Sequence, residues 1–310
     1  MFLFAFNQNI DNIKYSLNSQ DLASSSVIFT KTTDTIDFYC SNDSYWIYYK
    51  PELKEYDNIQ NGKMSLSKIT YKPELITNEK TNHIKLTNPK PGTYYVSISD
   101  LSSNATIESF LPINLTNENI VQLVVRENDT YIGYMTELLG TPFILPPKLL
   151  GVYGHQTDLR IGTDCAELAI YGMRRMGYNI PYCGPAGIVK YLEPTNDLKE
   201  GTIIHFGFQV SVLYKDNGLI GQLDDQDLVI HAYLDKVSID KLGDTGLLRN
   251  NYKLYKWKNW NNDVIDLSTF RNIQYLADIR NKCDHNAGEL SQEEVKEMIE
   301  GVDKIIKNVN

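Results

Sequence analysis

Short hydrophobic segments alternate with polar turn sequences from about residue 25 to residue 125. The segments are rich in β-branched and aromatic residues, which favour strands, and Asn61-Gly62 and Pro89-Lys-Pro-Gly92 are typical turn sequences between them. Several short strands at this spacing predict a small antiparallel sandwich. The strands are expected at 36–38, 45–49, 83–86, 93–98 and 120–125.

The pattern changes to helical spacing near Asn128. Asp129 or Thr130 is expected to cap a short helix that runs to Leu139. A second helix is predicted from Cys165 onwards, because apolar residues recur one turn apart and Gly177 is a typical C-terminal stop. Its apolar face comprises Cys165, Leu168, Ala169, Gly172 and Met176.

Strand-like segments follow this helix at 202–206, 209–214 and 228–232. A helix followed by strands is typical of an α+β domain. From about residue 267 the pattern is helical again, and Ser291-Gln-Glu-Glu294 is a capping box. We therefore expect an all-β sandwich-like domain over 1–127, an α+β domain over 128–265 and a helical extension over 266–310.

The composition suits a soluble globular protein, with 42% hydrophobic and 22% charged residues in 310. Its net charge of −9 argues against broad binding to nucleic acid phosphates. No apolar run is long enough to cross a membrane as a helix. The apolar start at 1–6 is too short for a signal peptide and lacks a basic leader. It is either the remnant of a trimmed signal or, as we expect, a first strand.

The four cysteines lie far apart in the sequence, without CxxC or zinc-like spacing. This spacing argues against a disulfide framework and leaves room for one reactive thiol. Cys165 is the candidate, since it opens a helix whose unpaired N–H groups and dipole favour a thiolate. Thr163 or Asp164 is the expected N-cap. The alternative is a small buried cysteine on an apolar helix face.

The segments around Cys165 occur in a characteristic order, from Tyr153-Gly154 through Gly162-Thr-Asp-Cys165 and its helix to three strands. Those strands read Thr202-Ile-Ile-His-Phe206, Gln209-Val-Ser-Val-Leu-Tyr214 and Val229-Ile-His-Ala232. Over roughly residues 130–235 this order resembles the NlpC/P60 family of cell-wall peptidases. The resemblance implies a papain-like α+β core, a thiol nucleophile and hydrolysis of amide bonds.

Carried over by position, the resemblance makes Cys165 the nucleophile. Tyr153 matches the tyrosine that shapes the oxyanion region, and His231 matches the third, orienting residue. One position departs from the pattern, because Gln209 stands where the family has its histidine base. Glutamine cannot accept a proton at neutral pH and so cannot be that base.

Three explanations for Gln209 stay open. In the first, His231 acts as the base, and Gln209 is an orienting residue or an oxyanion donor. In the second, a tight turn around Gly207 brings His205 beside Gln209, and His205 acts as the base. In the third, the domain has lost hydrolysis and only binds. His155, in the loop before Cys165, is a further candidate imidazole.

A second, shorter resemblance lies in the C-terminal segment. Asp278-Ile-Arg-Asn-Lys-Cys-Asp-His285 looks like the Arg-x4-His segment of HEPN domains, some of which are ribonucleases. By that resemblance Arg280 and His285 would act together at a dimer interface. The alternative is a helix that ends in polar residues before a turn.

Metal and cofactor sites have little support in the sequence. Asp224, Asp225 and Asp227 lack the glycine and glutamate positions of a calcium loop and are expected in a solvated turn. The segment from Gly151 to Gly162 has neither GxGxxG nor Walker spacing. We therefore expect neither a metal nor a cofactor.

The leading hypothesis is a cysteine amidase or peptidase that cleaves peptide or isopeptide bonds, for which cell-wall peptides are the substrates the resemblance implies. Such a function would place the protein outside the cytoplasm or at the cell envelope, and otherwise it would be cytoplasmic. The alternatives are an inactive relative that binds through the surviving cleft, and an interaction or RNA-processing protein that acts through its helical tail.

Overall fold

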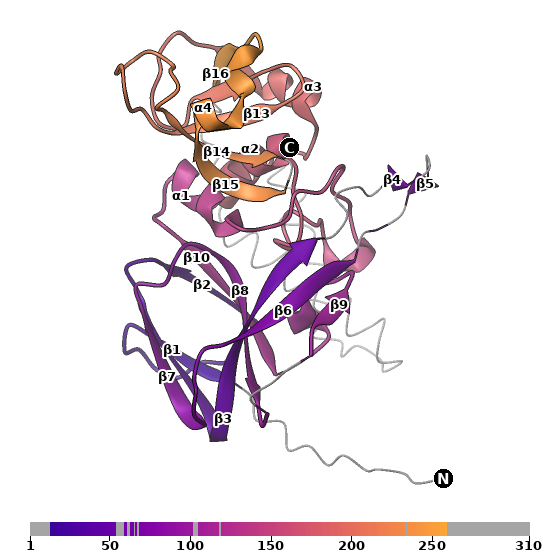
Figure 1. Ribbon diagram of the computed structural model, residues 1–310, viewed down its shortest axis with the longest axis vertical. Coiled ribbons are helices and arrows are strands. Elements are labelled where there is room, and N and C mark those ends of the chain that lie inside the picture. Colours follow the sequence, from indigo (N-terminus) through magenta and orange to yellow (C-terminus); the bar gives the residue numbers. More distant parts are fainter. Residues whose placement is uncertain are drawn as a thin grey trace, which may run out of the picture. The chain divides into compact units, whose positions relative to one another are not determined.

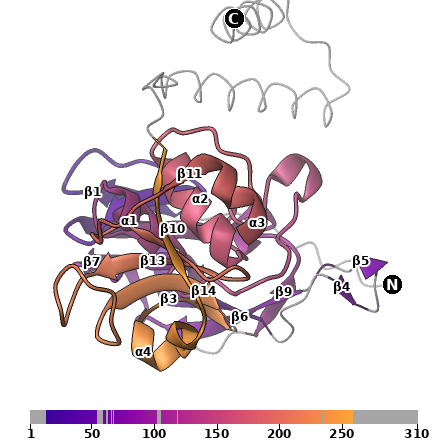
Figure 2. The same cartoon turned by 90° about the horizontal axis from the view of Figure 1, so that it is seen from above.

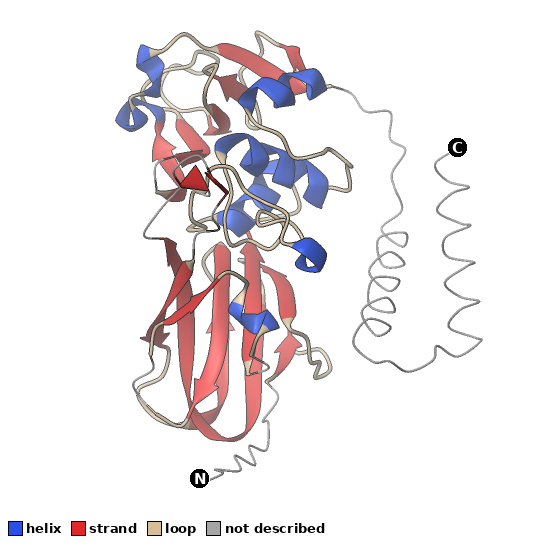
Figure 3. Ribbon diagram, turned by 90° about the vertical axis from the view of Figure 1, so that its right-hand side faces the viewer, coloured by secondary structure: helices blue, strands red, loops and turns tan. Residues whose placement is uncertain are grey.

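The computed structural model describes residues 13–53, 59–60, 63–64, 66, 68–101, 105–117, 119–233 and 235–258. The apolar start at 1–6 and the predicted helical tail, with Arg280 and His285, lie outside the described residues. The protein is a mixed α+β, strand-rich fold with two main sheets (Figures 1 and 3). No helix in the described part of the chain is both long enough and apolar enough to span a membrane.

The N-terminal strands form the first sheet, in the order β2-β10-β8-β3-β6-β9, and β1 and β7 pair with β3. Apart from the parallel pair β2 and β10, these strands are antiparallel. Their bounds are β1 Lys14–Leu17, β2 Val27–Lys31, β3 Thr35–Leu53, β6 Ile69–Leu75, β7 Thr81–Thr87, β8 Gly92–Ser99, β9 Ile107–Ser109 and β10 Ile120–Arg126. A separate pair, β4 (Ile59–Gln60) and β5 (Lys63–Met64), and a 3-10 turn at Ile113–Leu115 complete this region.

Strand β3 takes part in two sets of strand pairs, and this differs from the two separate strands predicted at 36–38 and 45–49. Its first half pairs with β1 and β7, and its second half pairs with β6 and β8. The change of partners coincides with a register shift between Tyr39 and Ser44. Side chains from both halves, including Phe38 and Trp46, share one core with Ile84 of β7 and Leu123 of β10.

The second sheet contains six antiparallel strands in the order β11-β16-β12-β13-β14-β15. Three strands and two helices were predicted in this region, and β11, β15 and β16 were not. The strands are β11 Leu192–Pro194, β12 Ile203–His205, β13 Val210–Lys215, β14 Leu228–Tyr233, β15 Lys236–Lys241 and β16 Lys253–Trp257. The helices are α1 Tyr131–Met135, α2 Cys165–Arg175, α3 Pro185–Ile188 and α4 Leu242–Thr245, with 3-10 turns at Thr136–Leu138, Gly151–Tyr153, Val189–Tyr191 and Leu247–Arg249.

Helices α1 and α2 pack together on one face of this sheet (Figure 2). The ring of Tyr131 in α1 lies edge-on to Trp257 in β16 at 6.1 Å. Trp257 points to the same face as Tyr255, and strand pairing extends that face through Ile203 and Val212 to Ile230. The opposite face is covered by a second core, which contains Leu213, Val229, Leu242 and Leu247.

The N-terminal sheet and the α+β region share buried contacts. Leu150 and Ile161, from the segment that leads to Cys165, pack in one core with Tyr95 and Ile120. Polar groups bridge the same contact, since the Arg160 guanidinium donates to Gln122 at 2.8 Å. By their contacts, the described residues up to Met176 and from Ile180 to Lys258 belong to one compact unit. The boundary expected at 127/128 lies inside this unit, directly after β10.

Candidate functional site

Cys165 is the first residue of α2, as its sequence position predicts. Of the two expected N-caps, Asp164 has this role, because its carboxylate accepts a hydrogen bond from the Glu167 amide at 2.9 Å. The helix ends at the C-cap Met176, and Gly177 follows with a φ of +97°. Cys165 itself is buried, with 6% of its surface exposed.

The Cys165 thiol is in a setting that favours its neutral form. Burial, and then the negative charge of Asp164, raise the pKa of the thiol to about 12. Backbone N–H groups, including those of Val210 and Ala166, lower it by less. The helix N-terminus was expected to stabilise a thiolate, but here desolvation outweighs that effect.

Two buried carboxyl groups share the helix N-terminus with the thiol. Burial raises the pKa of Asp164 to about 6. Burial, together with the charge of Asp164, raises the pKa of Glu167 to about 8. Thr157 Oγ1 donates a hydrogen bond to Glu167 Oε2 at 2.6 Å, and His155 Nδ1 lies 3.5 Å from the same oxygen. The positive end of the helix is therefore already occupied by acidic side chains.

Gln209 is buried directly before β13. Its side-chain nitrogen donates to the carbonyl oxygens of Ala232 at 3.1 Å and Val210 at 3.2 Å. Both amide protons are therefore committed to the backbone, and neither is left for an oxyanion. Gln209 holds the beginning of β13 against the end of β14.

His205 lies beside the beginning of β13, where the predicted tight turn is present. Gly207 has a φ of +88°, and the Phe206 amide donates to the Gln209 carbonyl at 2.9 Å. His205 consequently pairs with Val210, whose backbone N–H lies near the thiol. The ring is fixed by backbone groups on both sides: Nε2 donates to the Pro185 carbonyl at 2.8 Å, and Nδ1 accepts from the Gly207 amide at 3.0 Å.

His231 in β14 is held by an acidic partner that the sequence did not indicate. Its Nε2 lies 3.0 Å from Asp240 Oδ2, and Ser238 Oγ donates to that same oxygen at 2.5 Å. Nδ1 is buried and has no hydrogen-bond partner. Burial lowers the pKa of the imidazole, and Asp240 opposes this effect. Asp240 was not predicted as a site residue, because β15 was not among the predicted strands.

Side-chain alternation in β14 directs His231 away from α2. Residues 229, 231 and 233 point to one face, and 230 and 232 point to the other. Val229 belongs to the core with Leu242, whereas Ile230 faces the helices. His231 and the helix that carries Cys165 therefore belong to opposite faces of the sheet.

The remaining candidates surround the loop before α2. Tyr153 ends the 3-10 turn at Gly151–Tyr153, and 52% of its surface is exposed. His155 stacks on Tyr182 with 4.5 Å between ring centroids, and burial lowers its pKa. In the part of the chain that the structure describes, no imidazole hydrogen-bonds to the Cys165 thiol. The same residues include no group of three His, Cys, Asp or Glu side chains that could hold a metal.

No protein family model matches the chain, and neither a curated protein nor a solved structure is significantly similar to it.

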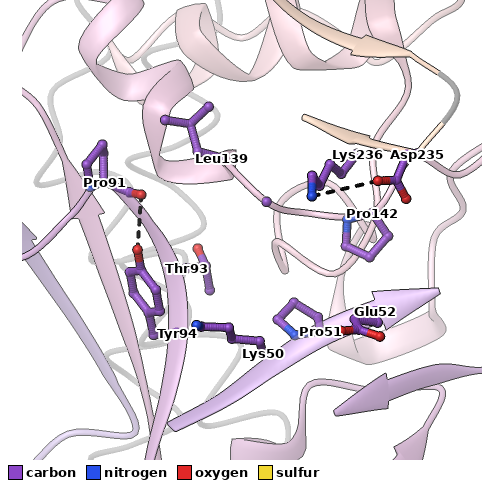
Figure 4. Close-up of a pocket in the computed structure, with 11 residues that line it drawn as sticks. Lys50, Pro51, Glu52, Pro91, Thr93, Tyr94, Leu139, Pro142, Asp235 and Lys236 are labelled. Atoms are coloured by element: carbon purple, nitrogen blue, oxygen red, sulfur yellow. Dashed lines mark hydrogen bonds and ion pairs between the residues drawn. The ribbon is translucent and has the colours of Figure 1, made fainter. Parts of the chain in front are cut away.

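A cleft of about 540 Å³ lies elsewhere, where β3 and β8 meet the segment after α1 and the β14–β15 turn (Figure 4). We call it the junction cleft. Lys50 and Glu52 line one side, and Asp235 and Lys236 line the other. Tyr94 closes one end, with its hydroxyl donating to the Pro91 carbonyl at 3.3 Å. Neither Cys165 nor any candidate imidazole contributes to this cleft.

Proposed function

We propose that this chain is a binding protein built on an NlpC/P60-like, papain-like scaffold that no longer hydrolyses amide bonds. The observation that carries the proposal is the state of Cys165. Its thiol is buried, its pKa is raised to about 12, and no imidazole of the described residues hydrogen-bonds to it. A thiol nucleophile needs a thiolate and a base within hydrogen-bond reach.

The neighbouring residues support the same proposal. Gln209 occupies the expected base position, and its amide is bonded to the backbone. Both ring nitrogens of His205 have backbone partners, as a structural histidine has. The junction cleft, in contrast, has the volume that small-molecule sites have, which is about 300–1,000 Å³. The fold therefore contains a cleft suited to binding, whereas Cys165 lacks the thiolate and the base that catalysis needs.

Alkylation of the folded protein tests the proposal. We expect iodoacetamide to leave Cys165 unlabelled at pH 6, because the neutral thiol is a poor nucleophile. The more exposed Cys40 and Cys183 serve as internal comparisons at pH 9, and peptide mapping with a Cys165→Ala control assigns the label. Stoichiometric labelling of Cys165 at pH 6 would refute the proposal.

A matched variant tests whether the site around Cys165 lacks only a base. In Gln209→His the imidazole stands at the position where the resembled family has its base. If the scaffold is otherwise intact, labelling of Cys165 at pH 6 increases by about tenfold or more over wild type. Gln209→Asn, which also lacks a base, is the control and should leave the labelling at the wild-type level.

One observation favours a second candidate, the cysteine hydrolase of the leading hypothesis. Cys165 is the first residue of α2 and its sulfur receives backbone N–H groups, including that of Val210, as the nucleophile of a papain-like scaffold would. This candidate predicts cleavage of cell-wall peptides by wild type, lost in Cys165→Ala. Such a pattern of activity would replace the binding proposal.

A further inference from the structure

A second cleft, of about 450 Å³, opens between the strands of the N-terminal region, for which the sequence predicts a sandwich. Strands β3, β7 and β8 and the turn between β7 and β8 contribute most of its lining. We call it the sandwich cleft. It adjoins the junction cleft, because Lys50 and Tyr94 line both. It is far in sequence from Cys165 and contains none of the residues considered above for catalysis.

The inner wall of the sandwich cleft is aromatic and apolar. Tyr48 and Tyr94 lie with 5.6 Å between their ring centroids, and Leu86 and Leu123 complete the wall. All four belong to, or pack against, the core shared by both halves of β3. A flat apolar group placed here would contact aromatic faces and remove its own surface from water.

The rim of the cleft is positively charged, although the chain as a whole has a net charge of −9. Three lysines and one glutamate line it, and the glutamate, Glu74, is paired with Lys50. Lys85 and Lys90 are exposed, and neither has an ion-pair partner among the described residues. Two ammonium groups are therefore free to meet an anion.

A hydroxyl group is also available inside. Tyr94 donates to the Pro91 carbonyl, but Tyr48 makes no hydrogen bond to the described residues. Burial, together with the nearby Tyr94 and Glu74, raises the pKa of Tyr48, so its hydroxyl keeps its proton and can donate. The cleft thus combines an apolar wall, one free donor and two unpaired cations.

We propose that the sandwich cleft binds a small organic anion, with its apolar body against Tyr48 and Tyr94 and its carboxylate on Lys85 and Lys90. Charge complementarity selects the anion, because every other charged group of the lining is already paired. The volume is within the range of sites for single small molecules. This site is independent of whether Cys165 is reactive.

Isothermal titration with 1-naphthoate and with the neutral 1-naphthylmethanol tests the proposal on the full chain. We expect 1-naphthoate to bind saturably with one site per chain, and the alcohol to bind about tenfold or more weakly, since a charge-assisted hydrogen bond is lost. Lys85→Ala/Lys90→Ala should weaken naphthoate to the level of the alcohol. Lys85→Arg/Lys90→Arg should retain the binding.

Lys215→Ala is the matched control, because Lys215 is an exposed lysine in β13 of the other sheet, and it should bind as wild type does. Three results would overturn the proposal: no saturable naphthoate binding, equal affinity for acid and alcohol, or unchanged affinity in the double alanine variant. Cys165→Ala should bind naphthoate normally, so the outcome is separate from that of the alkylation experiment.

Discussion

At the scale of single residues, the decisive contacts around Cys165 are electrostatic. Asp164 has two effects there: its carboxylate caps α2, and its charge raises the pKa of the adjacent thiol. A sequence shows that an acidic residue precedes the cysteine, but it does not show that both become buried. This is why the cap was predictable from the sequence and the neutral thiol was not.

Replacing Asp164 with Asn separates these two effects. Asparagine is as good an N-cap as aspartate, so α2 should keep its stability, while the loss of the charge lowers the thiol pKa. We expect Cys165 to react with iodoacetamide roughly two- to tenfold faster at pH 9 than in wild type. The exposed Asp197→Asn is the control. An unchanged rate would mean that Asp164 does not influence the thiol.

Glu167 makes folding depend on pH. Its pKa in the folded protein, about 8, lies above the ordinary value of 4.5, so the folded state holds a proton that the unfolded state releases. The resulting stabilisation is complete below about pH 4.5 and is lost as the pH rises through 8.

Glu167→Gln should therefore match wild type in melting temperature at pH 4.5 but exceed it at pH 8, by about 2–4 °C for each kcal/mol gained. The glutamine oxygen can still accept the hydrogen bond from Thr157. Thermal melts across this pH range give the comparison, with the exposed Glu79→Gln as control. A variant that is less stable than wild type at pH 8 would contradict this account.

At the scale of elements, hydrophobic periodicity predicted those elements whose signals lie within their own sequence. The other elements depend on pairing with strands elsewhere in the chain. Helix α2 was predictable because its apolar spacing, cap and stop lie within its own sequence. Strand β3 was predicted in two pieces because the polar residues Ser41-Asn-Asp-Ser44 look like a turn. They stay extended in β3 because both flanking halves pair with other strands. His231 was recognised as a site candidate, whereas its partner Asp240 lies on a strand without a clear sequence signal.

A buried carboxylate connects three of these elements. Glu137, fully buried after α1, pairs with Arg175 of α2 at 2.8 Å and accepts from the Tyr171 hydroxyl at 2.5 Å. Arg126 of β10 lies 3.7 Å away. Removal of Glu137 would leave the Arg175 guanidinium without its ion-pair partner among the described residues.

Glu137→Gln should accordingly lower the free energy of unfolding by about 3–5 kcal/mol in urea titrations. Asp129→Asn is a fitting control, because it also removes a partner of Arg126 but from an exposed pair, and it should cost at most about 1 kcal/mol. Equal losses in the two variants would show that burial of Glu137 adds nothing.

At the scale of the whole molecule, buried apolar and buried polar groups join the N-terminal sheet to the α+β region. Tyr95 and Ile120 pack with Ile161, and Gln122 accepts from Arg160. Elements that depend on each other in this way should unfold together.

Hydrogen exchange monitored by mass spectrometry across a urea series should therefore give coincident unfolding transitions for peptides from β10 and from α2. Exchange of β10 at clearly lower urea than α2 would show two independently stable parts. The same measurement on the Glu137→Gln variant is more sensitive. If the two regions can unfold separately, their transitions should differ in this variant at lower urea than in wild type.

The division of β3 between two sets of partners also determines when the N-terminal sheet can form during synthesis. Its partners in β6, β7 and β8 extend to Ser99, and β2 waits for β10, which ends at Arg126. A ribosome must therefore release the chain as far as Arg126 before the first sheet can close. Until β6, β7 and β8 have emerged, β1 is the only described partner available to the 19-residue β3, and its remaining unpaired edges can associate with other nascent chains.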